Sequence, residues 1–144
     1  MKMYYFAYGS NMNHQQMKKR CPSSRFVKRA FLEGYKFVYD GYSKTRNGAV
    51  ANIIETGKKE DVVWGGLFEI NEDNLSALDC YEGYPKSYDR KEVKVKDDEG
   101  NHYTAIVYFR TGKPKSKPSE NYRNLVIQGA KDCGLPEWYI QNNL

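Results

Sequence analysis

The stretch Tyr4-Tyr5-Phe6-Ala7-Tyr8-Gly9-Ser10-Asn11 decides the fold, because five apolar or aromatic residues run together before a polar turn breaks the run. Such a run is typical of a strand that is buried on both faces. Gly9 lets a ligand approach the main chain closely, and the two residues after it are both good helix N-caps. Residues 12–20 favour a helix and end before Cys21-Pro22, so we predict a helix there.

This turn has two interpretations. A strand, a glycine turn and a helix N-terminus together make a small pocket of backbone N–H groups, which favours an anion. The alternative is a strand-to-helix turn with an ordinary cap and no ligand, since such turns are common. The residues of the turn by themselves leave both interpretations open.

Composition places the chain among globular proteins. Its 144 residues fit one domain, residues 1–144, and hydrophobic residues make up 40% and charged residues 28%. No apolar run approaches the roughly 20 residues that cross a bilayer. The N-terminus enters a strand without the features of a signal peptide. We therefore expect no membrane partner.

The cysteines indicate the compartment. Cys21, Cys80 and Cys133 are odd in number and widely spaced, which favours reduced thiols in a cytoplasm over a disulfide framework. The sequence has no Cys-x-x-Cys pair and its two histidines lie far apart, so we expect no structural zinc site. The expected location is therefore cytoplasmic.

The formal net charge of +5 allows an acidic partner or substrate, or only a soluble surface. Much of the excess lies in Lys113-Pro114-Lys115-Ser116-Lys117-Pro118, which is typical of an exposed loop. A basic, proline-rich loop is usually solvated surface and falls short of a recognisable nucleic-acid-binding module. We therefore expect no nucleic-acid partner, with binding of nucleic acid by this loop as an alternative.

Strand and helix patterns alternate along the rest of the chain. Further strands are predicted over 25–32, 35–39, 49–54, 62–70, 88–96 and 103–109, helices over 71–81 and 119–133, and a last turn over 135–140 whose aromatics pack down. The short connections 33–34 and 97–101 predict two hairpins. Gly65-Gly66 inside a strand predicts a bulge, a bend or a close approach of backbone or ligand. Six or seven short strands and three helices indicate an α+β protein, with a barrel rather than a sandwich.

Glu82 is a carboxylate in an unexpected position. It lies seven residues after Leu75 and four after Leu78, so all three share one face of the predicted helix and the carboxylate points inward. Burial raises the pKa of such a carboxylate, and the negative end of the helix dipole acts in the same direction. A raised pKa suits a general base or acid near neutral pH.

The alternative places Glu82 at a frayed helix end, where it turns to solvent. Asp79, one turn earlier, falls off the apolar stripe and is expected to be exposed. His14 and His102 carry no motif for serine–histidine catalysis. We interpret Cys80 as a small apolar filler on the helix, with a cysteine nucleophile as the alternative. The sequence contains no phosphate loop and no dinucleotide fingerprint.

Several motifs together resemble the gamma-glutamylcyclotransferase family. Tyr5-Phe6-Ala7-Tyr8-Gly9-Ser10-Asn11-Met12 is similar to its N-terminal motif, and the likeness continues in the family's order along nearly the whole chain. The other matching segments are residues 48–53, 63–65, 78–83, 88, 119–122 and 129–136. A lone Tyr-Gly-Ser-Asn would be a weak signal, but the set together is strong.

The resemblance implies a small mixed β-barrel of six or seven strands, flanked by helices, with one substrate cavity. The family's catalytic glutamate corresponds to Glu82, its substrate-holding loop to residues 5–10 with Asn11 beside them, and two cavity tyrosines to Tyr88 and Tyr122. The implied reaction uses no metal or cofactor and releases 5-oxoproline and a free amine or amino acid from a small γ-glutamyl substrate. The resemblance also implies an acyltransferase or amidine-type C–N lyase of glutathione metabolism, and it is compatible with a homodimer.

That chemistry agrees with the residues. A γ-glutamyl group carries its own nucleophile, the α-amine, and its own electrophile, the γ-carbonyl, so folding the chain captures the advantage of an intramolecular reaction. Glu82 would take a proton from the α-ammonium and return it to the departing amine. The N–H groups at Gly9-Ser10-Asn11 would hold the α-carboxylate or the developing oxyanion.

Alternatives remain for the substrate and for single residues. Relatives of this architecture also act on γ-glutamyl-amines, glutathione or γ-glutamylated antibiotics, and a non-catalytic homologue would only bind a small γ-glutamyl or amino-acid ligand. The block at residues 134–136 favours γ-glutamyl amino acids. Strict alternation places Tyr88 opposite Val93 and Val95, so Tyr88 is either a cavity residue or a strand-edge tyrosine. Tyr122 either lines the cavity or belongs to the core.

Overall fold

A computed structural model describes residues 2–144 of the chain. The strands are β1 (Met3–Ala7), β2 (Arg25–Glu33), β3 (Tyr35–Ser43), β4 (Gly48–Glu55), β5 (Val62–Ile70), β6 (Asp89–Lys96) and β7 (His102–Phe109). The helical segments are the 3-10 turn η1 (Ser10–Met12) and the helices α1 (His14–Arg20), α2 (Glu72–Glu82), α3 (Glu120–Asp132) and α4 (Glu137–Asn143).

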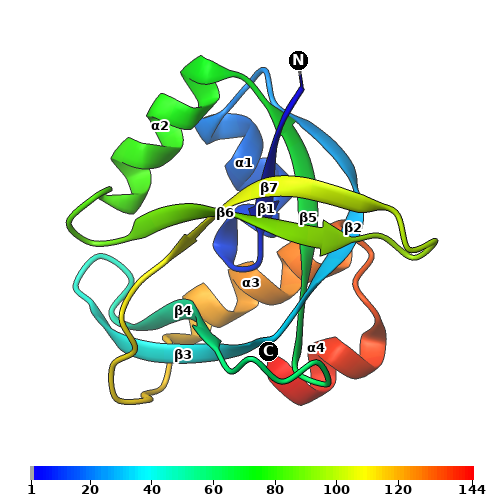
Figure 1. The fold of residues 1–144 in the computed structure, drawn as a ribbon. Helices are drawn as coiled ribbons and strands as arrows, with labels where there is room; N and C mark the ends of the chain where they lie inside the picture. The colour runs from blue at the N-terminus through cyan, green and yellow to red at the C-terminus, as the bar shows by residue number, and fades with distance from the viewer. Residues whose placement is uncertain (1) are drawn as a thin grey trace.

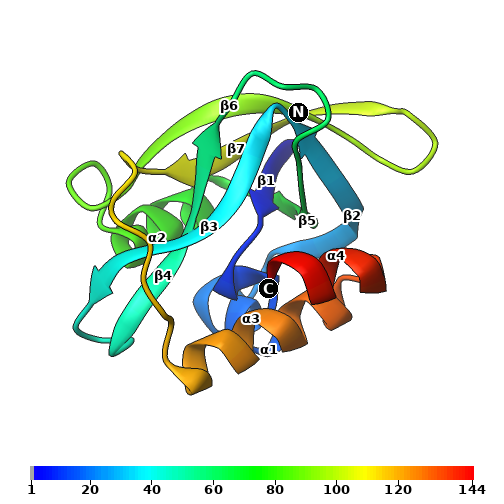
Figure 2. The same cartoon turned by 90° about the horizontal axis from the view of Figure 1, so that it is seen from below.

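Five of the strands in residues 2–144 close into a barrel in the order β1-β5-β2-β6-β7 (Figure 1). Neighbouring strands run antiparallel except β1 and β7, which are parallel where Tyr5 pairs with Ile106. The predicted α+β fold with a mixed barrel is confirmed, but the barrel has five strands rather than six or seven, because β3 and β4 pair only with each other. The other two strands, β3 and β4, form a separate two-stranded sheet beside the barrel (Figure 2).

The predicted hairpin of residues 25–32 and 35–39 is wrong. β2 pairs with β5 and β6, whereas β3 pairs with β4. At the corner between them Gly34 has a φ of 86°, its N–H donates to the Asp61 carbonyl, and its own carbonyl accepts from the N–H groups of residues 56 and 57. These bonds tie the corner to the β4–β5 connection, so the chain leaves the barrel after β2 instead of folding back on it.

Gly65 and Gly66 in β5 show the close approach that the sequence predicts. A Cβ on Gly65 would collide with the Ala7 carbonyl oxygen, and one on Gly66 would collide with the Cys133 sulfur. The β1 backbone and the end of α3 can therefore lie directly against β5. The irregularity in strand register lies on the neighbouring strand β2.

The turn after β1 differs from the prediction. Residues Ser10–Met12 form a 3-10 turn, and no side chain caps it. Asn13, rather than Ser10 or Asn11, caps the following helix: its side-chain oxygen accepts the Gln16 N–H at 3.0 Å. The Ser10 and Asn11 side chains are thereby left for the other partners described below.

Helix α2 forms as predicted. The Asn71 side chain accepts the Asn74 N–H at 2.8 Å and the Asn74 side chain accepts the Asn71 N–H at 3.0 Å, which is a capping box. Gly83 ends the helix in the left-handed conformation, with a φ of 67°. Leu75 and Leu78 are buried, so this helix face turns the end of α2 toward the interior.

The two C-terminal helices also begin and end close to the predicted places. Ser119 caps α3 by accepting the Tyr122 N–H at 3.1 Å, and Gly134 follows that helix with a φ of 72°. The last turn is the helix α4, in which Tyr139 is buried but Trp138 is 56% exposed. The predicted packing of its aromatics therefore holds for Tyr139 and is wrong for Trp138.

A hydrophobic core fills the barrel and continues under the helices. The helices α2 and α4 lie on opposite sides of the barrel (Figure 1). Within residues 2–144, no helix is long and apolar enough to cross a membrane. The cysteines are free thiols, with Cys21 and Cys133 buried and Cys80 exposed.

Candidate active site

A cavity of about 550 Å³ lies where the turn after β1, the end of α2 and the β3–β4 sheet meet. Eight of the ten predicted site residues line it: Tyr5, Tyr8, Gly9, Ser10, Asn11, Glu82, Tyr88 and Tyr122. They come from β1 and its turn, from α2, from the segment before β6 and from α3. Residues that are far apart in the sequence therefore share one cavity wall.

Phe6 and Ala7 are the two predicted site residues that do not line this cavity. Their side chains are buried in the hydrophobic core, and Phe6 lies against β5 where Gly65 lacks a side chain. β1 is buried on both faces, and successive side chains of a strand point to opposite faces. Only part of the predicted loop can therefore face the cavity.

Glu82 ends α2 half-buried in the cavity wall. Burial raises the pKa of its carboxyl above the ordinary value, while Arg20 and Arg46 act in the opposite direction. No hydrogen bond from residues 2–144 contributes to this shift. The end of the helix is held by the Tyr84 N–H, which donates to the Asp79 carbonyl at 2.9 Å, so the frayed alternative is wrong.

Two tyrosines meet at the backbone of Ala51 in β4. The Tyr88 hydroxyl donates to the Ala51 carbonyl at 2.7 Å, and the Tyr122 hydroxyl accepts the Ala51 N–H at 3.1 Å. Gly9 faces the same place, since a Cβ on Gly9 would lie 2.9 Å from the Ala51 Cβ. The glycine turn and both tyrosines therefore lie against the same residue of β4, Ala51.

Both Tyr88 and Tyr122 border the cavity, which decides between the alternatives of cavity and strand edge for Tyr88 and of cavity and core for Tyr122. β6 begins at Asp89, so alternation within that strand does not govern Tyr88, whose side chain lines the cavity. Tyr122 belongs both to the buried core and to the cavity wall, because its ring is buried while it still borders the cavity.

Gln16 of α1 connects the glycine turn to the β3–β4 sheet. Its side-chain nitrogen donates to Ser10 Oγ and Asn11 Oδ1, both at 2.9 Å, and its side-chain oxygen accepts from Arg46 Nη2 at 3.0 Å. The backbone N–H groups of residues 9–11 donate to no acceptor within residues 2–144. The side chains thus hold the turn, and the residues that carry these unpaired donors line the cavity.

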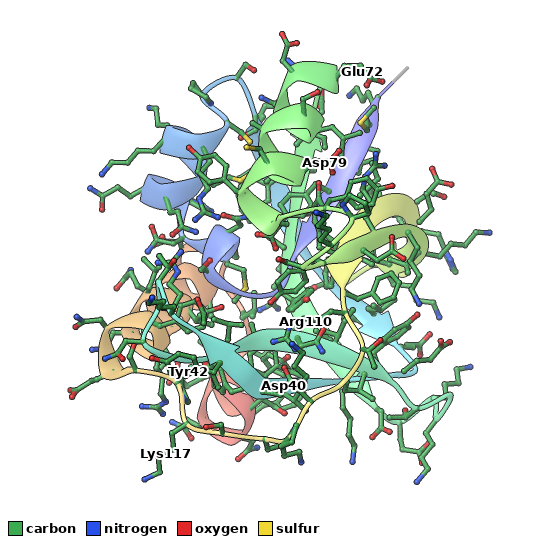
Figure 3. The ribbon with its side chains drawn as sticks, turned by 90° about the vertical axis from the view of Figure 1, so that its left-hand side faces the viewer. Asp40, Tyr42, Glu72, Asp79, Arg110 and Lys117 are labelled. Carbon is green, nitrogen blue, oxygen red and sulfur yellow. The ribbon has the colours of Figure 1, made fainter. Side chains whose placement is uncertain are left out.

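Tyr108 of β7 joins the cavity wall to α2. The Tyr8 hydroxyl donates to the Tyr108 carbonyl at 2.8 Å, and the Tyr108 hydroxyl donates to Asp79 Oδ1 at 2.6 Å. Arg90 Nε lies 3.0 Å from the same carboxylate oxygen (Figure 3 labels Asp79 on α2). The expectation that Asp79 is exposed is therefore wrong, because β6 and β7 pass beside the helix and supply its partners.

The cysteines differ in their access to the cavity. Cys80 is exposed and lines the cavity, so its interpretation as an apolar filler is wrong. Cys133 Sγ lies 3.6 Å from His14 Nε2, but the thiol is buried outside the cavity wall and burial raises its pKa. Within residues 2–144, no group of three or more His, Cys, Asp or Glu side chains is placed to hold a metal ion.

Comparison with known proteins shows the family of this chain. Residues 62–142 match the AIG2-like family. Over 140 residues the chain is 36% identical to the gamma-glutamylcyclotransferase of Homo sapiens, covering 94% of this chain and 73% of that protein. The chain belongs to the gamma-glutamylcyclotransferase family. The protein of the same name from Mus musculus is 34% identical over the same shares of the two chains.

The fold supports the same membership. A solved structure of a gamma-glutamyl cyclotransferase superposes with a TM-score of 0.90 at 34% identity, covering 98% of this chain and 85% of that chain. The closed mixed barrel with its surrounding helices is thus shared with a gamma-glutamylcyclotransferase, and the motifs that resembled the family lie on a common framework.

The cationic residues of this gamma-glutamylcyclotransferase-family cavity were not found by sequence reasoning. They are Arg20, Arg46, Lys86, Arg110 and Lys113. They come from separate segments, and nothing distinguishes most of them among the 23 lysines and arginines of the chain. Two signals were available: Lys113 begins the basic loop, which is exposed as predicted, and Arg110 directly follows an apolar strand.

Proposed function

We propose that this chain is a γ-glutamylcyclotransferase that cyclises γ-glutamyl amino acids or dipeptides, with Glu82 as general acid and base. The products are 5-oxoproline and a free amino acid or peptide. One observation carries the proposal: a half-buried carboxylate with a raised pKa lines the same cavity as residues 9–11, whose N–H groups are unpaired. The names and the similarity of the relatives support the same activity.

The reaction joins two groups of the substrate itself. Glu82 takes a proton from the α-ammonium, and the free amine attacks the γ-carbonyl carbon. The new carbon–nitrogen bond closes a five-membered ring, and the bond from the same carbon to the leaving nitrogen breaks. The protons that the α-nitrogen loses end on the leaving nitrogen, with Glu82 as the relay. A cavity that holds the substrate folded supplies the advantage of an intramolecular reaction.

The surroundings of Glu82 suit this relay. Burial without hydrogen bonds makes the carboxylate a stronger base than an exposed glutamate, and Arg20 and Arg46 limit the rise in its pKa. A group that must first accept and then return a proton works best when its pKa lies near the operating pH. The position and environment of Glu82 therefore support its role more strongly than those of Asp79, which Tyr108 and Arg90 already engage.

The glycine turn is proposed to hold the charge of the substrate. The N–H groups of residues 9–11 have no acceptor within residues 2–144, so they are free for a carboxylate or an oxyanion. Charge-assisted bonds of this kind are about twice as strong as neutral ones. Gln16 keeps the turn in place through Ser10 and Asn11, and Tyr88 and Tyr122 keep Ala51 in place across the cavity.

The proposal is tested by incubating the protein with γ-glutamyl-alanine and measuring 5-oxoproline. Wild type is expected to form it, and Glu82→Gln is expected to bind the substrate without forming it. Asp73→Asn, which neutralises an exposed carboxylate of the same helix, is the control and keeps full activity. Binding without product in the wild type would instead identify a non-catalytic homologue, and full activity of Glu82→Gln would contradict the mechanism.

A further inference from the structure

Arg110 is a buried cation in the cavity wall with one donor group unused. Its side chain is only 10% exposed, and its Nη2 lies 2.7 Å from Asp40 Oδ1 and donates to the Asp40 carbonyl at 3.0 Å. Its Nη1 is buried and has no hydrogen-bond partner within residues 2–144. A buried donor without an acceptor is unfavourable, so this nitrogen is suited to an acceptor that a ligand brings.

Asp40 and its neighbours hold the guanidinium in one orientation. The Asp40 side chain is 1% exposed, and its Oδ2 accepts the Lys113 N–H at 3.0 Å and the Asn52 side-chain N–H at 3.3 Å. Arg110 Cζ lies 5.2 Å from the centre of the Tyr88 ring. In Figure 3 Arg110 lies next to Asp40, beside the β3–β4 sheet. The donor is therefore fixed before any substrate binds.

The charge of the cavity wall indicates which ligand group this donor meets. Within residues 2–144 the wall carries one carboxylate, Glu82, against the five cationic side chains named above. The γ-glutamyl part of a substrate has one carboxylate and one ammonium, and is neutral overall. A γ-glutamyl amino acid carries a further carboxylate on its leaving group, whereas a γ-glutamyl-amine does not. The excess of positive charge fits the substrate with the second carboxylate.

We infer that Arg110, held by Asp40, selects substrates whose leaving group carries a carboxylate, by donating its free N–H to that carboxylate. The inference rests on the proposed function and assigns a specificity residue to it. Arg110 enters the cavity from the end of β7, whereas the backbone donors of residues 9–11 enter from the turn after β1. The two anions of the substrate thus have donors on different elements.

The test compares γ-glutamyl-alanine with γ-glutamyl-alaninamide, which differ by that carboxylate alone. The readout is the ratio of their kcat/KM values. For wild type we expect a ratio on the order of 10 to 100 in favour of the acid, the range of a hydrogen bond to a charged group. In the double variant Asp40→Asn with Arg110→Gln, which leaves neither charge buried alone, the ratio is expected to fall to about one, through KM.

Two further variants make the result specific. Arg110→Lys keeps the charge but loses the planar fork, and is expected to lower the ratio several-fold. Lys117→Gln removes an exposed positive charge that lies in the neighbouring loop and outside the cavity wall, and is expected to keep the wild-type ratio. Circular dichroism and thermal melting show which variants are folded. If the double variant does not fold, the test rests on Arg110→Lys, which keeps the ion pair with Asp40.

Each other outcome overturns the inference. A wild type without preference, or a folded double variant or Arg110→Lys with the wild-type ratio, means that Arg110 does not read the leaving group. An equal loss on both substrates means that Arg110 serves the γ-glutamyl part instead. A wild type that releases 5-oxoproline from neither substrate overturns the proposed function itself. The two kinds of failure are distinguishable, because the outcomes that overturn only the role of Arg110 still show turnover by the wild type.

Discussion

The β6–β7 turn holds a buried carboxylate and the end of α2 holds a half-buried one, and the two carboxylates have different partners. In the turn, Asp97 Oδ1 accepts the N–H groups of Glu99 at 3.0 Å and Asn101 at 2.9 Å, and Oδ2 accepts Lys28 Nζ at 3.1 Å. At the end of α2, no hydrogen bond contributes to the pKa of Glu82, which faces the cavity.

The two carboxyl groups therefore have opposite pKa shifts. Burial by itself raises the pKa of both. At Asp97 the hydrogen bonds from Asn101 and Lys28 outweigh burial and lower the pKa from about 3.8 to about 2. At Glu82 burial outweighs the attraction of Arg20 and Arg46, and the pKa is raised. The partners of a buried carboxylate, rather than its depth, decide whether it stabilises the fold or is free to exchange a proton.

The largest effect is expected for Glu82→Gln. This change removes the proton relay and keeps the shape of the side chain, so kcat on γ-glutamyl-alanine is expected to fall by about 1,000-fold or more. The melting temperature is expected to stay the same or rise slightly, because a partly buried carboxylate without hydrogen bonds is unfavourable. The value of kcat and the melting temperature are measured on one preparation. A large loss of melting temperature would show that Glu82 stabilises the fold as Asp97 does.

The matched change in the turn, Asp97→Asn, is expected to act on stability instead. It removes several charge-assisted hydrogen bonds at the β6–β7 turn, so the melting temperature at neutral pH is expected to fall by several degrees. Asp97 lies outside the cavity wall, so the folded variant is expected to form 5-oxoproline at nearly the wild-type rate. An unchanged melting temperature would remove the distinction between the two carboxylates.

A smaller effect is expected in the pH dependence of stability. Because the pKa of Asp97 is lowered in the folded state, its stabilising contribution is fully present above about 3.8, the ordinary value, and is lost as the pH falls toward about 2. Urea unfolding of wild type and Asp97→Asn over this pH range is expected to show their stability difference shrinking as the pH falls. A difference that stays constant would show that Asp97 acts through packing and not through its charge.

The smallest effect is expected for Arg46→Gln. Arg46 is one of the cations that lower the pKa of Glu82, so its removal lets that pKa rise further. Since the base must be ionised to accept a proton, the acidic limb of the pH profile of kcat is expected to move to higher pH. Lys44→Gln, an exposed neutralisation in the same connection between β3 and β4, is the control. A shift of the limb to lower pH would contradict the assignment of Glu82 as the base.

The sequence by itself determined the local parts of this protein. The cap at Asn71 and the glycine at position 83 sufficed to predict α2. The spacing of Leu75, Leu78 and Glu82 indicated an inward direction for the last carboxylate, with a frayed helix end as the alternative. These features depend on residues within two helical turns of one another, and helical periodicity records such relations directly. The family resemblance added the cavity tyrosines, which no local pattern distinguished from core.

The tertiary structure alone decided the long-range parts. The bond from Gly34 to Asp61 takes β3 out of the barrel, β6 and β7 supply the partners of Asp79, and Arg110 pairs with Asp40 across 70 residues of sequence. Each depends on hydrogen bonds between segments that meet only after the barrel closes, and no periodicity along the chain records which segments those are. Hence Glu82 could be named as a candidate from the sequence, whereas Arg20 and Arg46, the two cations that lower its pKa, could not.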